Sequence, residues 1–143
     1  MERILVIMNA QHYTWEALGR AVSLAKRIKA RVFVLRVFSH EEKEAGVEQY
    51  TKISVERRLE NIIQTARSDS VTIEYFVTEG NFEEEVVCFI EHNKISLLVV
   101  EPGSWETNIS EKGWGFIQEI MYRISCRVEV VSPKIYFKNG KER

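Results

Sequence analysis

The feature that most constrains this chain is an alternation of short apolar runs, rich in β-branched residues, with segments of helical period. The apolar runs cover residues 3–8, 31–38, 71–77, 96–100 and 127–132, and their length and composition predict β-strands. Between the first two runs, apolar residues recur three and four positions apart, which predicts a helix with one buried face. The residues of that face are Ala17, Leu18, Ala21, Leu24, Ala25 and Ile28.

A strand, a helix and a further strand in the same direction require a crossover connection, and repeated crossovers produce a parallel sheet covered by helices. Residues 4–7 and 97–100 are apolar at every position, as expected of interior strands buried on both faces. The second crossover is longer, and its helix has an inner face formed by Leu59, Ile62, Ile63 and Ala66. We therefore predict an α/β fold: a single doubly wound open sheet of five mainly parallel strands, with helices on both faces.

The size of the chain suits one domain. Its 143 residues can bury one core but are too few for two, so we predict a domain over residues 1–133 and a C-terminal tail over residues 134–143. Asn139 onward reads as a solvated terminus, whereas the consecutive Ile135, Tyr136 and Phe137 are expected to be covered.

Charge and hydropathy exclude two classes of partner. Twenty basic and 21 acidic residues leave a formal net charge of −1, so no global field attracts nucleic acid or anionic lipid. The first apolar run is too short for a membrane span or a signal peptide. We expect a cytoplasmic protein without nucleic-acid or membrane partners.

Catalytic and metal motifs find little support in the sequence. Cys88 and Cys126 lie far apart in apolar stretches, which favours reduced core cysteines. His12, His40 and His92 have no metal-ligand spacing around them, and Ser104 lacks the surroundings of a nucleophile elbow. The acidic residues 83–85 follow Asn81 at a predicted helix start, where the helix dipole favours negative charge. We predict neither an enzyme nor a metal site.

Several segments together resemble the universal stress protein family. The opening strand, helix and strand resemble its first βαβ unit, and the later segments follow in the family's order and spacing, so the resemblance extends from Arg3 to Ser132. The segments are residues 3–9 (RILVIMN), 17–26, 30–37 (ARVFVLRV), 78–81 (TEGN), 95–100 (ISLLVV) and 125–131 (SCRVEVV). The resemblance implies the strand order 3-2-1-4-5 and a cleft at the carboxyl ends of the first and fourth strands.

In family members that bind ATP, a glycine-rich motif between the fourth and fifth strands lets backbone amides approach the phosphates. Its three glycines and the serine or threonine that follows them fall here on Glu101, Ser104, Trp114 and Gly115, so the spacing is kept while all three glycines are lost. Asn9 stands where these members usually carry an aspartate, and it keeps the hydrogen-bonding reach without the charge. The resemblance therefore implies a member that does not bind ATP in the usual way.

Two functions remain open. The first is a regulatory or interaction domain with an unknown protein partner, forming a homodimer through the fifth strand, whose Val128, Val130 and Val131 leave an apolar edge. It requires no cofactor.

The second function is a sensor of ATP, another adenine nucleotide or another small ligand in the cleft. Its binding positions would be Asn9, Val37, Glu101, Gly103, Ser104, Trp114 and Gly115. Trp105 and Trp114 are interpreted mainly as a plug of the vacated pocket, with an aromatic ligand wall as the alternative, and Trp15 as a core or subunit-contact residue.

Overall fold

The structure is a computed structural model that describes residues 1–9, 13–39, 49–101 and 110–131. Strands and helices alternate along it. The elements are β1 (Arg3–Asn9), α1 (Trp15–Ile28), β2 (Arg31–Phe38), α3 (Gln49–Ser68), β3 (Ile73–Glu79), α4 (Phe82–His92), β4 (Leu97–Val100), α5 (Ser110–Arg123) and β5 (Arg127–Val130).

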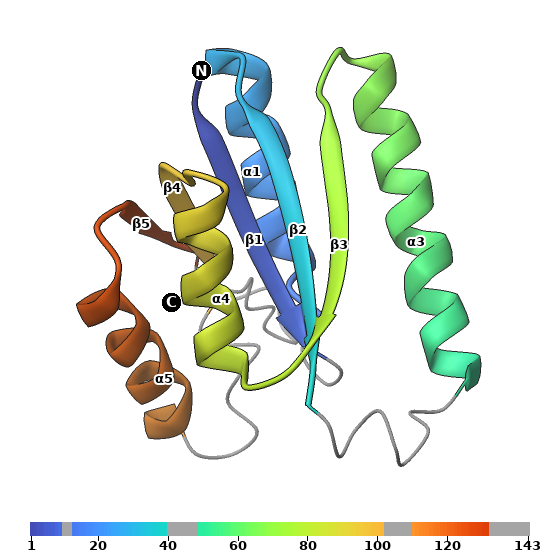
Figure 1. The fold of residues 1–143 in the computed structure, drawn as a ribbon. Coiled ribbons are helices and arrows are strands. Elements are labelled where there is room, and N and C mark those ends of the chain that lie inside the picture. The colour runs from blue at the N-terminus through green and yellow to red at the C-terminus, as the bar shows by residue number, and fades with distance from the viewer. Residues whose placement is uncertain (10–12, 40–48, 102–109, 132–143) are drawn as a thin grey trace, which may run out of the picture.

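The five strands form one parallel sheet in the order β3-β2-β1-β4-β5. Helices α4 and α5 cover one face of this sheet, and α1 and α3 cover the other (Figure 1). The two runs that are apolar throughout became β1 and β4, which both lie inside the sheet. This architecture confirms the predicted doubly wound α/β fold.

Each face of the sheet has its own core because side chains alternate between the two faces of a strand. Ile4, Val6 and Met8 of β1 pack toward α1 and α3, whereas Leu5 and Ile7 pack toward α4 and α5. All five are at most 1% exposed, and full burial of one such side chain contributes about 1.5–3 kcal/mol. The strand β1 is therefore the centre of the molecule.

The third strand differs from its predicted range. It begins at Ile73 rather than Val71, because the amide of Val71 donates to Ala66 O at 2.8 Å and closes the end of α3. The strand then continues through Thr78 and Glu79, which pair with Val37 and Phe38 of β2. The range predicted from the apolar run thus missed both ends of β3.

Two side chains expected in the core are exposed. Ile28 is 46% exposed because it ends α1, and the chain reverses at Lys29, which adopts a left-handed conformation. Cys88 is exposed because Val86 and Ile90 turn inward from α4 and the residue midway between them faces outward. The expectation of a core cysteine was wrong for Cys88, whereas Cys126 is half-buried, and both are free thiols.

The start of α4 follows the predicted capping chemistry. The side chain of Asn81 accepts a hydrogen bond from the Glu84 amide at 3.0 Å, and Glu83, Glu84 and Glu85 occupy the first turn. Gly80 precedes the cap at φ +152°, where an added Cβ would meet Glu85 Oε2 at 2.6 Å. None of the helices in the described part of the chain carries the long apolar stretch that a membrane crossing requires.

Candidate functional site

Three of the predicted cleft residues meet at one edge of the sheet. Asn9 is the last residue of β1 and pairs with Val37 of β2. On the other side of β1, Glu101 directly follows β4, which also pairs with β1. Because the carboxyl ends of parallel strands share an edge, these residues are brought together as expected.

The remaining predicted positions are not placed as a site. Gly103 and Ser104, like Trp105, lie outside the described residues. Trp114 and Gly115 fall within the backbone range of α5, but their side chains are not among those that the structure describes. The predicted plugging role of the two tryptophans stays a prediction.

Val37 contributes little of its side chain to this edge. It is 1% exposed and packs in the core beneath α4 and α5, together with Leu35 and Ile117. Its neighbour Asn9 is half-buried. At this edge, therefore, ligand contacts from β2 would come from the backbone rather than from the valine side chain.

Glu101 caps helix α1 from a distant part of the chain. Thr14, the residue before α1, directs its hydroxyl to Ile7 O at 2.9 Å and provides no side-chain cap. Instead the Ala17 amide donates to Glu101 Oε1 at 3.0 Å. A carboxylate at this position satisfies one of the open amides of the helix start and interacts favourably with the positive end of the helix dipole. The N-terminus of α1 is thus already occupied by the carboxylate of Glu101.

The environment of Glu101 changes its acidity. Burial, at 6% exposure, raises the pKa of this carboxyl, and the negative charge of Glu16 adds to the rise. The hydrogen bonds from the Ala17 and Glu16 amides lower the pKa but do not cancel the effect of burial. The charged form of Glu101 is therefore harder to bury than its protonated form.

This raised pKa predicts a pH dependence of stability. Between the ordinary pKa of a glutamate and the raised value, the folded state holds a proton that the unfolded chain has released. The contribution of Glu101 to the free energy of unfolding is therefore fully present below the ordinary pKa and is lost as pH rises through the raised one. Urea unfolding at several pH values should show that wild type loses stability relative to Glu101→Gln over this window. A difference that does not vary with pH would contradict the assignment.

A second cluster lies beside this edge, and sequence reasoning missed it. Arg36 of β2 is 0% exposed and points toward the α3 face, opposite to Val37. Its Nη1 donates to Tyr75 Oη at 3.0 Å and to Glu56 Oε2 at 3.3 Å. The Tyr75 hydroxyl itself donates to Glu56 Oε2 at 2.9 Å. An arginine within an otherwise apolar strand was the available sequence signal.

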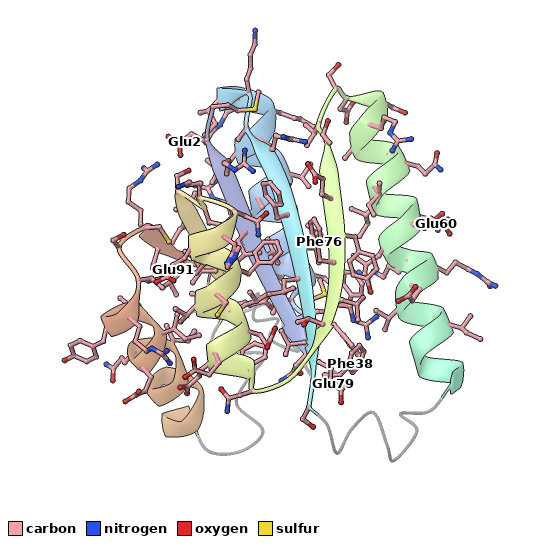
Figure 2. All side chains as sticks on the ribbon, viewed as in Figure 1. Glu2, Phe38, Glu60, Phe76, Glu79 and Glu91 are labelled. Atoms are coloured by element: carbon pink, nitrogen blue, oxygen red, sulfur yellow. The ribbon has the colours of Figure 1, made fainter. Side chains whose placement is uncertain are left out.

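Aromatic rings complete the surroundings of this guanidinium. Its central carbon lies 4.9 Å from the ring centre of Phe38 and 5.9 Å from that of Tyr13, distances at which a cation is attracted to the ring face. Burial raises the pKa of Tyr75 to about 12, so its phenol is protonated at neutral pH. Phe38 and Glu79 mark the carboxyl ends of β2 and β3 on the side-chain view (Figure 2).

An open cleft of about 620 Å³ lies between α3 and β3. Glu56 and Tyr75 line it, and Arg57, Gln64 and Arg67 of α3 contribute polar groups to its wall. This α3–β3 cleft therefore borders the two hydrogen-bond partners of Arg36 with both basic and acidic side chains.

Other candidate residues show no catalytic arrangement. Within the described ranges, no three histidine, cysteine or acidic residues are placed to bind a metal ion. His92 is exposed, and its Nδ1 lies 3.3 Å from Cys88 O. Trp15 is half-buried against the core, with the Arg58 guanidinium carbon 4.2 Å from its ring centre. His12 and His40 lie outside the described residues.

The fifth strand leaves part of its apolar surface accessible. Val130 is 44% exposed, and Val128 and Val131 are half-buried. Glu129 forms an ion pair with Arg20 of α1, which ties this strand to the helix behind it. In the described sheet, β5 pairs with β4 on one side, so its other side is a sheet edge.

Comparison with known proteins agrees with this architecture. The universal stress protein family model matches residues 1–104, which is more than half of the chain. No curated protein sequence matches the chain significantly.

Solved structures provide further matches at low sequence identity. The hypothetical protein MJ0577 is 19% identical with a TM-score of 0.71, covering 94% of this chain and 97% of its own. The universal stress protein UspA from Lactobacillus plantarum is 14% identical with a TM-score of 0.68, covering 91% and 97%. A universal stress protein family protein from Arabidopsis thaliana with AMP bound is 15% identical with a TM-score of 0.59, covering 94% and 93%.

At these identities the structural likeness establishes the fold, and the family rests on the model that spans residues 1–104. The predicted resemblance is thereby confirmed at the level of the family and its sheet order. This chain belongs to the universal stress protein family.

Proposed function

We propose that this protein is a regulatory or interaction domain of the universal stress protein family that does not bind or hydrolyse ATP in the usual way. The observation that carries the proposal is the buried Glu101 carboxylate, hydrogen-bonded to the Ala17 amide at the carboxyl edge of the sheet. A glycine in this position, as in the motif of ATP-binding members, would leave room for phosphate. Two unit charges 4 Å apart at a partly buried surface repel by about 4 kcal/mol, so the carboxylate opposes a triphosphate.

A calorimetric titration tests the proposal. Nucleotide-free protein is titrated with ATP and Mg²⁺, AMP or cyclic AMP, and we expect no heat of binding with ATP. The Glu101→Gln variant, which keeps a hydrogen-bond acceptor without the charge, should gain weak affinity for ATP. Glu79→Gln is the matched control, because Glu79 ends β3 at the same edge of the sheet and is exposed. Micromolar binding of ATP to wild type would refute the proposal.

The second candidate is a sensor of adenine nucleotides. The AMP-bound relative from Arabidopsis thaliana favours it, as does the pairing of Asn9 with Val37 at the edge where the family cleft would lie. AMP has no triphosphate, so it meets less repulsion from Glu101. Binding of AMP that is weakened by Asn9→Ala, with no binding of ATP, would support this function.

A homodimer through β5 belongs to the same proposal. Pairing two copies of this edge strand around a two-fold axis would cover Val130 and complete the backbone hydrogen bonds of the edge. We expect sedimentation equilibrium to report a dimer for wild type and a monomer for Val130→Lys. Val77→Lys is the matched control, because Val77 is 51% exposed on β3, the strand at the opposite edge of the sheet. A wild-type monomer at high concentration would contradict the dimer.

A further inference from the structure

Arg36 has a vacant hydrogen-bonding edge inside the protein. Its Nε and Nη2 are buried and have no hydrogen-bond partner in the described part of the chain. Its two hydrogen-bond partners, Tyr75 and Glu56, both accept from Nη1. The Nε–H and one Nη2–H bond of a guanidinium point in parallel, so the vacant edge is the one that binds two oxygens of a carboxylate or phosphate side by side.

Buried donors without an acceptor lower the stability of the fold, so their presence here calls for a reason other than stability. The loss is greater for a donor that carries charge. The neighbouring strand positions that face the same side, Val32 and Val34, are apolar and fully buried. A valine would satisfy the packing pattern at position 36 as well. The charged side chain is therefore poorly explained by stability alone.

The surroundings of the guanidinium are built to hold it in one orientation. Phe38 and Tyr13 contact it through their rings, and Tyr75 and Glu56 hold the Nη1 end. Glu56 is 43% exposed, so water screens its charge and leaves Arg36 as a cation that is only partly neutralised. A fixed guanidinium with a free bidentate edge is suited to an anion with two adjacent oxygens.

The surface next to the cluster is open to solvent. The α3–β3 cleft reaches Glu56 and Tyr75, and its wall carries both basic and acidic side chains. On the neighbouring strand, Val77 pairs with Arg36 and is 51% exposed. The cleft brings a small ligand to the two partners of Nη1, and because Arg36 itself is 0% exposed, an anion reaches the vacant edge only when the side chains that cover it shift.

We propose that Arg36 is the anchor of an anion-binding site, in which its Nε and Nη2 donate to two oxygens of a carboxylate or phosphate group on a small ligand. This site is separate from the nucleotide positions assigned above, and it does not depend on whether ATP binds.

The first experiment observes Arg36 directly in the wild-type chain. Nitrogen-15 NMR follows the assigned arginine Nε–H signals while inorganic phosphate, or in a second series acetate, is added at constant ionic strength. We expect a saturable shift of the Arg36 signal with at least one of the two anions, and the effective anion identifies the ligand as phosphate-bearing or carboxylate-bearing. No shift of the Arg36 signal with either anion would overturn the proposal, even if every variant failed to fold.

Variants then test the bidentate geometry. Arg36→Lys keeps the charge but loses the fork, so the anion affinity should fall at least about tenfold. Arg36→Met removes the charge and should abolish binding, whereas the control Arg57→Met removes an exposed arginine of the α3–β3 cleft and should change the affinity less than about threefold. Equal affinity of wild type and Arg36→Lys, or a larger loss in Arg57→Met than in Arg36→Lys, would contradict a site anchored on Arg36.

Discussion

Replacing Phe33 by alanine is expected to lower the free energy of unfolding by about 3–5 kcal/mol, the range for deleting a fully buried aromatic side chain. Phe33 is 1% exposed in the core beneath α4. Its ring lies 6.1 Å from that of Phe89 in an edge-on arrangement and 6.3 Å from that of Phe76. The Arg3 guanidinium carbon lies 5.0 Å from the ring centre. Alanine would leave a cavity in the middle of β2 that the strand cannot close.

Urea unfolding followed by circular dichroism measures this loss, with Phe76→Ala as the control. Phe76 belongs to the same aromatic group but is 37% exposed on the edge strand β3, and it is labelled in the side-chain view (Figure 2). Water can occupy the space left by its ring, so we expect a loss of about 1–2 kcal/mol. Equal losses in the two variants would show that Phe33 is not the better buried of the two residues.

Replacing Glu56 by alanine is expected to cost about 2–3 kcal/mol of unfolding free energy. Removing one partner of a buried ion pair leaves the other charge uncompensated, typically at a cost of about 3–5 kcal/mol. Glu56 is 43% exposed whereas Arg36 is fully buried, so screening by water reduces the expected loss. Tyr75 would keep a single hydrogen bond to Arg36.

The opposite substitution should behave differently. Arg36→Met removes the buried charge and keeps most of the apolar stem, so we expect a change within about 1 kcal/mol of wild type. Chemical denaturation of both variants under one condition makes the comparison. If Arg36→Met proves more destabilising than Glu56→Ala, Arg36 is a stabilising part of the core, and the reasoning that its charge is poorly explained by stability fails.

The losses of stability expected at Phe33 and at Glu56 differ in how far the sequence alone predicts them. Phe33 lies in a run whose composition already predicted a strand, and its burial follows from the presence of helices on both faces of the sheet. The stabilising role of Glu56 could not be predicted from the sequence, because α3 brings Glu56 beside Arg36, a strand residue 20 positions earlier in the chain. Which helix residue meets a buried charge depends on how the helix packs.

The ends of elements were harder to predict than their existence. The run at residues 71–77 identified β3, but its start was decided by the hydrogen bond from Val71 to the end of α3 and its finish by pairing with Phe38. Likewise, helical spacing predicted that Ile28 is buried, but its position at the end of α1 leaves it exposed. Local patterns report the period of a segment, whereas its ends depend on neighbours that are distant in sequence.

The sequence by itself determined the class of fold, because apolar period is a local property of each segment, and its resemblance to known members predicted the family, the strand order and the meeting of Asn9, Val37 and Glu101 at the carboxyl edge. Only the tertiary structure decided that Glu101 caps a helix 84 residues earlier and that Arg36 is buried with a vacant edge. Both depend on which groups meet across elements, and a charged side chain in a sequence carries no record of the partner that the fold places beside it.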